Sequence, residues 1–223
     1  MTDLNRYGYE IADLVLSDSA CERMAEELPD VASGRGGVRN LIEHPTVAAM
    51  LRDPRFVRAI SVPGLVAVKA TLFDKTPEAN WRVQWHQDRM IAVCERREIE
   101  GYGPWAMKDG VPHVEPPAAV LEEMLAVRVH LDACGPDNGP LRVIPGSHQR
   151  GKLSAEEIAK LALSGPIAQI TLPQGALLLM RPLLVHASSP ATEANHRRVL
   201  HLELAPRQII EPLQWHRSVP LSF

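Results

Sequence analysis

The chain has 223 residues, with 24 basic and 27 acidic side chains, nine histidines and a formal net charge of -3. This length suits one domain with a sizeable core, and the charge lacks the basic excess typical of proteins that bind nucleic acids or anionic membranes. Three scattered cysteines argue against a disulfide framework, and with no signal-like or membrane-length apolar stretch we expect a soluble cytoplasmic protein.

Helical patterns dominate the first sixty residues. Ser17 or Asp18 can cap a helix over 17–28, in which apolar side chains recur at helical spacing. A second helix is expected from residue 46 to about 60, broken or kinked at Pro54. The glycine-rich segment 34–37 between them is predicted to be a loop. It is not a phosphate cradle, because no strand precedes it and no Gly-Lys-Ser/Thr follows.

After residue 64 the pattern changes to short apolar or alternating runs divided by turn residues, which is typical of a β-sandwich or jelly roll. The predicted strands are 66–73, 81–88, 125–131, 141–144, 167–172, 176–180 and 198–204. The proline- and glycine-rich segment 98–119 is too long for a hairpin loop, and loops of that length in compact domains are usually functional covers. No repeat or linker divides the chain, so a single domain over 1–223 is expected.

The clearest chemical signal is His86-Gln-Asp88, at the end of a predicted strand. Side chains two positions apart share one face of a strand, so the imidazole and the carboxylate converge while Gln87 turns away. One histidine and one carboxylate are two thirds of the facial triad that binds iron(II). A second copy, His130-Leu-Asp132, has the same spacing, and the residues alone do not decide between the two.

Two further features lie near the end of the chain. His186 follows an apolar run and could complete either triad. Arg197 and Arg198 open the last predicted strand, where a guanidinium could pair with a carboxylate through two hydrogen bonds.

Three segments in this order resemble the phytanoyl-CoA dioxygenase family, a branch of the iron(II)/2-oxoglutarate oxygenases. They are Val83–Asp88, Asn138–His148 and the tail from His186 to Glu203, and the resemblance extends from Tyr7 to about Pro206. It implies a mainly β fold with flanking helices, built on a double-stranded β-helix (a cupin-like jelly roll). In this family the Asn-Gly and Pro-Gly-Ser-His segment follows the strand after the metal-binding pair.

That order implies His86, Asp88 and His186 as iron ligands and places His130 and Asp132 on a later strand. It also implies that Arg197 binds the distal carboxylate of 2-oxoglutarate. Strand periodicity leaves Arg198 open as an alternative, since Arg198 shares its face with Leu200, Leu202 and Leu204. We favour Arg197, because it stands where the family's arginine stands and a charged cosubstrate suits the more polar face.

Other candidates for contact with the cosubstrate follow from position. Ser188, two residues past the distal histidine, matches a position of the family that can contact the same cosubstrate. Lys69 and Arg128 lie on the strands before and after the metal-binding pair. Gln84 is two residues before His86. A solvated strand face or plain packing remains open for Lys69, Arg128 and Gln84.

The resemblance implies oxidation of an unidentified small molecule by iron(II), 2-oxoglutarate and O2, with release of succinate and CO2. The carboxylate of Asp88 argues against halogenation, for which related enzymes have a small residue. The alternative is a metal protein of the same fold that is not an oxygenase. Substrate specificity is expected in the cover at 98–119, with Trp105 and His113 as candidate contacts; a stiffened surface loop is the other reading.

Overall fold

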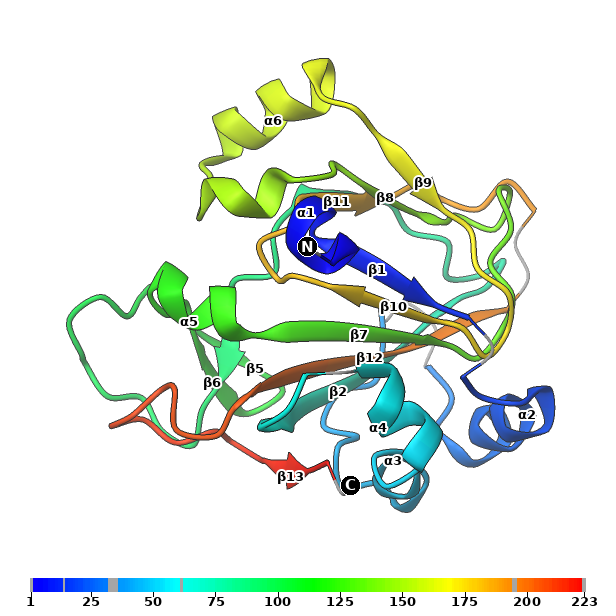
Figure 1. The fold of residues 1–223 in the computed structure, drawn as a ribbon, viewed down its shortest axis with the longest axis horizontal. Helices are drawn as coiled ribbons and strands as arrows, with labels where there is room; N and C mark the ends of the chain where they lie inside the picture. The colour runs from blue at the N-terminus through cyan, green and yellow to red at the C-terminus, as the bar shows by residue number, and fades with distance from the viewer. Residues whose placement is uncertain (1, 14, 32–35, 61, 194–195, 222–223) are drawn as a thin grey trace.

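A computed structural model describes residues 2–13, 15–31, 36–60, 62–193 and 196–221 (Figure 1). The described residues form three antiparallel sheets. Most strands are short, as expected, but β2 and β12 have 11 and 10 residues. Two of the sheets carry the cavity described below, and the third forms a cover beside them. Among these residues every helix is too short or too polar to cross a lipid bilayer.

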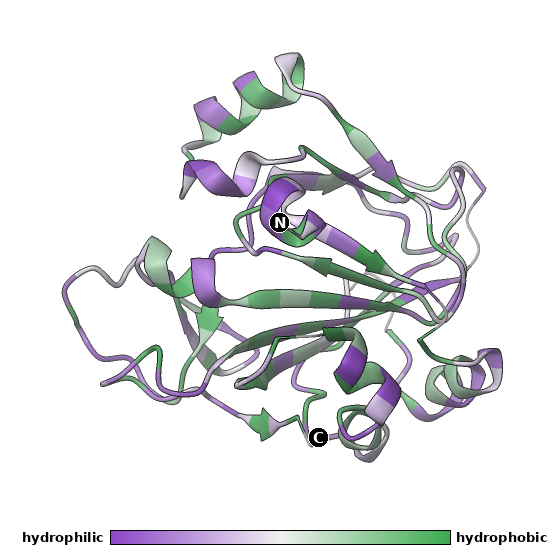
Figure 2. Ribbon diagram, viewed as in Figure 1, coloured by the Kyte–Doolittle hydropathy of each residue, from purple (hydrophilic) through white to green (hydrophobic). Residues whose placement is uncertain are grey.

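The largest sheet has six strands in the order β1-β10-β7-β12-β2-β13. Its members are β1 (Tyr9–Ala12), β10 (Leu177–Met180), β7 (Leu125–His130), β12 (Arg197–Pro206), β2 (Leu65–Lys75) and β13 (Val219–Pro220). Figure 2 shows apolar residues along the central strands β7 and β10, in keeping with their burial on both faces.

The second sheet has four strands in the order β3-β11-β8-β9. They are β3 (Val83–His86), β11 (His186–Ser188), β8 (Leu141–Val143) and β9 (Ala168–Ile170). Residues of β3, β11 and β8 line a cavity together with residues of β2, β7 and β12, so the cavity lies between the two sheets. This is the double-stranded β-helix arrangement expected from the sequence resemblance.

The expected cover at 98–119 contributes two strands, β5 (Trp105–Lys108) and β6 (Val111–Val114), to a small third sheet. Its third strand, β4 (Ile91–Ala92), pairs with β6 and precedes the expected cover. Strands β5 and β6 form a hairpin whose two-residue turn, Asp109-Gly110, has positive φ at both positions. That turn matches the right-handed twist of the flanking strands and favours glycine. The cover therefore has defined structure, and it does not form one long loop.

The helices lie outside the two main sheets (Figure 1). They are α1 (Asp3–Tyr7), α2 (Asp18–Glu27), α3 (Pro45–Met50), α4 (Pro54–Ile60), α5 (Ala118–Glu123) and α6 (Ala155–Ser164), with a 3-10 turn at Ser147–Arg150. Ser17 caps α2 by accepting from the backbone N–H of Ala20, and the expected second helix is divided before Pro54 into α3 and α4. The expected glycine-rich loop at 34–37 lies partly outside the described residues.

The main core depends on the alternation of β12. Leu200, Leu202 and Leu204 project from one face of the strand and pack with apolar side chains of α2, α3 and α4. The opposite face carries Arg197, His201 and Glu203, which line the cavity. The six-stranded sheet thus has an apolar face against the helices and a charged face toward the cavity.

Candidate active site

Three side chains from one sheet converge in the cavity. His86 on β3 and His186 on β11 are directly opposite each other in the antiparallel pair, with ring centroids 4.2 Å apart. Asp88 follows β3 and places its two carboxylate oxygens 3.6 Å from His86 Nε2 and 3.7 Å from His186 Nε2. One ligand atom from each residue lies within 4.8 Å of the other two. This is a histidine, carboxylate, histidine set on one side of a cavity.

Gln87 fixes the position of Asp88. Its side chain is buried on the far side of the chain, where it donates to the carbonyls of Leu183 and Gly151 and accepts from the N–H of Leu153. The N–H of Asp88 itself donates to the carbonyl of Pro182 at 2.9 Å. These bonds hold the residue after β3 in a defined place, so the carboxylate faces the two imidazoles.

The two histidines present the correct nitrogen for a metal. His86 Nδ1 lies 2.8 Å from the carbonyl of Gln84, and His186 Nδ1 lies 2.9 Å from the carbonyl of Leu184. A carbonyl only accepts, so each Nδ1 carries a proton and Nε2, on the Asp88 side, is the nitrogen available to a metal. Metal-bound histidines are oriented in this way, by a bond from the second ring nitrogen. The donor set therefore fits a divalent metal of the iron type.

The three residues of the triad differ in how their charge is set: burial lowers the pKa of His86, but the hydrogen bond and charge of Asp88 raise it above its ordinary value. Burial opposes ionisation of Asp88, but the neighbouring His186 and His86 hold the pKa of its carboxyl well below the usual range. Burial lowers the pKa of His186 to about 4, so its imidazole is neutral near pH 7. A neutral histidine beside a carboxylate is the protonation state that a metal requires.

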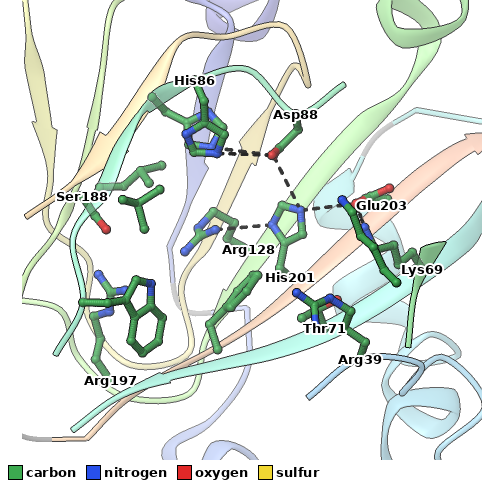
Figure 3. Close-up of a pocket in the computed structure, with 16 residues that line it drawn as sticks. Arg39, Lys69, Thr71, His86, Asp88, Arg128, Ser188, Arg197, His201 and Glu203 are labelled. Carbon is green, nitrogen blue, oxygen red and sulfur yellow. Dashed lines mark hydrogen bonds and ion pairs between the residues drawn. The ribbon is translucent and has the colours of Figure 1, made fainter. Parts of the chain in front are cut away.

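The cavity next to the triad has a volume of about 260 Å³. Its sixteen lining residues are Arg39, Lys69, Thr71, Phe73, Trp81, Val83, His86, Asp88, Lys108, Arg128, Leu141, His186, Ser188, Arg197, His201 and Glu203. Figure 3 shows Arg197 on one side of this cavity and Lys69 with Arg39 on the other, with Arg128 and His201 between them.

Arg197 is buried, at 4% exposure, at the first of these two ends. Its backbone N–H donates to Asp74 Oδ1, and one terminal nitrogen donates to the carbonyl of Gly139. Its Nε is buried without a hydrogen-bond partner among the described residues. A Cβ on residue 139 would lie 2.7 Å from the carbonyl oxygen of Ser189, so the Asn-Gly segment needs glycine there.

Arg198 takes the opposite direction. It forms two side-chain hydrogen bonds with Asp132, at 2.9 and 2.7 Å, and does not line the cavity. The structure thus brings Arg197 to the triad and gives Arg198 a carboxylate partner elsewhere. His130, two residues before that partner in sequence, ends β7 as a buried residue outside the cavity.

Ser188 lines the same end of the cavity as Arg197. It contacts Lys75, a residue that sequence reasoning missed. Lys75 is fully buried and donates from Nζ to Ser188 Oγ at 3.1 Å and to the carbonyl of Ser189. Burial, together with Arg197, lowers the pKa of Lys75 to about 7. The residue lies directly opposite Arg197 in the pairing of β2 with β12.

Arg128 and His201 occupy the middle of the cavity floor. An Arg128 nitrogen lies 3.4 Å from His201 Nδ1, and a guanidinium only donates, so the His201 proton is on Nε2. That Nε2 lies 3.9 Å from Asp88 Oδ2 and 4.0 Å from Glu203 Oε1. The Arg128 Nε is buried and has no partner among the described residues. Sequence reasoning gave no role to His201 or Glu203, although both share the face of Arg197.

The remaining candidates lie differently. Lys69 lines the cavity and pairs with Glu203 at 2.7 Å. The Gln84 side chain is exposed and lies outside the cavity. The pairing of β3 with β11 is irregular and sets Ser188 opposite Val83, so Val83 lines the cavity in place of Gln84. Trp105 packs against the apolar cluster beneath the cover, and His113 is buried; neither lines the cavity. The cover contributes Lys108 to the cavity.

Comparison with known proteins adds two findings. The family model described as phytanoyl-CoA dioxygenase (PhyH) matches residues 4–199. No protein in the curated collection of characterised sequences matches the chain.

Several solved structures share the fold at low sequence identity. AviO1 from Streptomyces viridochromogenes Tue57 is 23% identical with a TM-score of 0.64, and the match covers 91% of each chain. The non-heme alpha ketoglutarate dependent epimerase SnoN from nogalamycin biosynthesis is 16% identical with a TM-score of 0.64, covering 92% of this chain and 80% of SnoN. HygX from Streptomyces hygroscopicus, solved with nickel and 2-oxoglutarate bound, is 17% identical with a TM-score of 0.62, covering 91% of this chain and 84% of HygX.

Proposed function

Because the chain belongs to the phytanoyl-CoA dioxygenase family, it is a non-heme iron enzyme dependent on 2-oxoglutarate, and we propose that it hydroxylates or otherwise oxidises a small organic molecule. His86, Asp88 and His186 would hold the iron. Bound there, iron(II) supplies a centre at which O2 oxidises both 2-oxoglutarate, to succinate and CO2, and the substrate. The buried Arg197 at the end of the cavity next to the triad is the observation that carries the proposal.

The cavity offers 2-oxoglutarate a charge complement. The Nε atoms of Arg197 and Arg128 are buried without partners among the described residues, and unpaired buried donors are costly unless a ligand accepts from them. In this proposal Arg197 binds the distal carboxylate, and Ser188, itself bonded to Lys75, donates to the same group. Arg128 neutralises the second negative charge nearer the triad.

His201 and Glu203 have a different task in this proposal. With its proton on Nε2, His201 points a donor toward the Asp88 carboxylate, and it holds that tautomer because Arg128 donates to its other nitrogen. Burial lowers the pKa of His201 to about 3, so it remains a neutral donor near pH 7. His201 therefore presents a neutral N–H toward the carboxylate of the triad and does not carry charge to the cavity.

The test separates metal binding from cosubstrate binding. We expect the iron(II)-loaded protein to bind 2-oxoglutarate in anaerobic calorimetry and to convert it to succinate in air. His86→Ala and Asp88→Ala should abolish succinate release. Arg197→Met should weaken 2-oxoglutarate binding by about a hundredfold, the cost of losing a buried bidentate pair.

Arg198→Met is the matched control, since it removes the neighbouring guanidinium outside the cavity. It should leave the dissociation constant of 2-oxoglutarate within about twofold. Undiminished succinate release by His86→Ala or Asp88→Ala would overturn the proposal. Metal binding without any 2-oxoglutarate binding would favour a metal protein of the same fold that is not an oxygenase.

A further inference from the structure

Three cations gather at the end of the cavity farthest from Arg197. Lys69 is on β2, Lys108 ends β5 of the cover, and Arg39 lies in the segment before β2, where Val38 pairs with Leu72. We call Arg39, Lys69 and Lys108 the basic mouth. No stretch of sequence contains this cluster, because its members come from three separate segments that meet only in the fold.

The basic mouth is separate from the proposed 2-oxoglutarate end. Lys69 is paired with Glu203 across β2 and β12, whereas Arg197 begins β12. Glu203 is six positions after Arg197 in the same strand, so their backbones are about 20 Å apart at about 3.3 Å per residue. Figure 3 shows the same separation, with Arg39 and Lys69 on the side of the cavity away from Arg197.

Two of the three cations already have anionic partners. Arg39 pairs with Asp109 at 3.0 Å, and Lys69 pairs with Glu203 at 2.7 Å. Lys108 makes neither a hydrogen bond nor an ion pair with any residue that the structure describes, although it is half-buried and lines the cavity. Burial lowers the pKa of Lys108, and the charges of Lys69 and Arg39 lower it further. A like-charged cluster of this kind costs free energy unless a ligand supplies negative charge.

The negative charges among the described residues of the cavity itself form no ion pair with Lys108. Asp88 belongs to the triad, and Glu203 is shared between Lys69 and His201. A dianionic cosubstrate at the far end satisfies Arg197 and Arg128. Glu203 and Asp88 act on Lys108 only at longer range, so among the described residues it is a lining cation without an ion pair or hydrogen bond of its own.

We propose that the basic mouth binds an anionic group of the substrate, a carboxylate or a phosphate, with Lys108 as its direct donor and Lys69 and Arg39 as supporting charges. This specifies the substrate class of the proposed oxygenase and rests on that function for the chemistry, but the binding itself can be measured separately. The reacting carbon would lie between the anion and the triad. The cover thus selects acidic small molecules through Lys108, from the hairpin β5-β6.

The experiment uses full-length protein loaded with nickel(II), an inert substitute for iron(II), and saturated with 2-oxoglutarate so that its own site is filled. Matched acid and neutral compounds are titrated by calorimetry: phenylacetate against phenylacetamide, and phenyl phosphate against phenol. We expect at least one acid to bind about tenfold or more tightly than its neutral partner. The two pairs distinguish a carboxylate from a phosphate.

Variants test whether the preference for acids over neutral compounds comes from Lys108. Lys108→Met should reduce the acid-over-neutral ratio to below about threefold, and Lys108→Arg should retain most of it. Lys160→Met, a change on the outer helix α6, should keep the wild-type ratio. Circular dichroism of each variant checks that the fold is intact, and raised salt should reduce the ratio in every variant that keeps a positive charge at position 108.

Equal binding of acids and neutral partners, no binding by any acid, or an undiminished ratio in Lys108→Met would each overturn the inference. The function fails separately, if 2-oxoglutarate itself does not bind to the nickel-loaded protein. In that event the acid titrations are still decisive for the basic mouth, because the contrast between Lys108→Met and Lys160→Met does not depend on turnover.

Discussion

Individual residues at this site are sorted by which face of β12 they occupy. Arg197 and Arg198 are neighbours, yet one enters a cavity beside the triad and the other is held by Asp132 outside it. The alternation of a strand produces that division, since adjacent side chains project to opposite faces. Two arginines in succession therefore have different roles: Arg197 is a buried cation, and Arg198 belongs to an ion pair outside the cavity.

Lys75 provides a prediction at this scale, because its charge is expensive to bury. Its pKa is lowered to about 7 by burial, with a contribution from Arg197, while in the unfolded chain it is near 10.4. Between these values the unfolded chain binds more protons, so this residue makes the free energy of unfolding rise with pH. We expect about 2 kcal/mol of increase from Lys75 between pH 7 and pH 9.

Urea denaturation of the metal-free protein at both pH values measures this increase. Lys75→Met should remove this increase. The quantity to compare is therefore the change in free energy of unfolding between pH 7 and pH 9, in wild type and in the variant. Any constant loss of stability from leaving Ser188 and Ser189 without their donor cancels in that comparison. Equal pH dependence in the two proteins would contradict the prediction.

Sequence reasoning reached part of the site and could not reach the rest. The proposed triad was accessible because His86 and Asp88 lie two positions apart at the end of a predicted strand, and the order of the family's segments selected this pair over His130 and Asp132. Lys75 shares the strand face of Lys69 and could have been named on the same grounds. The basic mouth was not accessible, since the approach of Arg39 and Lys108 to Lys69 depends on tertiary pairing.

Among the elements, the N-terminus of α6 carries a capping motif that can be recognised in the sequence. Ser154 accepts from the N–H of Glu157, and the Glu157 carboxylate accepts from the N–H of Ser154, a complete capping box. The sequence Ser-Ala-Glu-Glu before an apolar run is the signature of this motif. The cover is the opposite case: its place was predicted, but its hairpin was obscured by the surrounding prolines and glycines.

The capping box gives a prediction for this element. Ser154→Ala leaves the N–H of Glu157 without its acceptor, and should lower the free energy of unfolding by about 1 kcal/mol. Ser164→Ala, in the last turn of the same helix, removes only an exposed bond to the carbonyl of Lys160 and should cost less than about 0.5 kcal/mol. Urea denaturation of both variants tests this, and equal losses would count against the cap.

At the scale of the whole molecule, the two main sheets contribute different parts of the site. His86 and His186 are on the four-stranded sheet, whereas Arg197, Arg128 and His201 are on the six-stranded sheet. A metal at the triad joins strands within one sheet. A 2-oxoglutarate held between that metal and Arg197 would connect the two sheets across the cavity.

This division predicts a stepwise effect of ligands on stability. Nickel(II) should raise the melting temperature, and 2-oxoglutarate should raise it further only when the metal is present. At a hundredfold excess over its dissociation constant, 2-oxoglutarate should add about 3 kcal/mol to the free energy of unfolding. Arg197→Met should keep the first increment and lose most of the second. His186→Ala should lose both, whereas an increment from 2-oxoglutarate in His186→Ala would contradict this arrangement.

The alternation of β12 also bears on how this protein can change over generations. Deleting or inserting one residue in that strand would exchange its leucine face with its charged face, and so disrupt the helix-facing core and the cavity at once. The tip of the β5-β6 hairpin does not contribute to both the helix-facing core and the cavity in this way. Substrate range can therefore drift through exchanges near Lys108, while the strand that carries Arg197 is confined to substitutions that preserve its length.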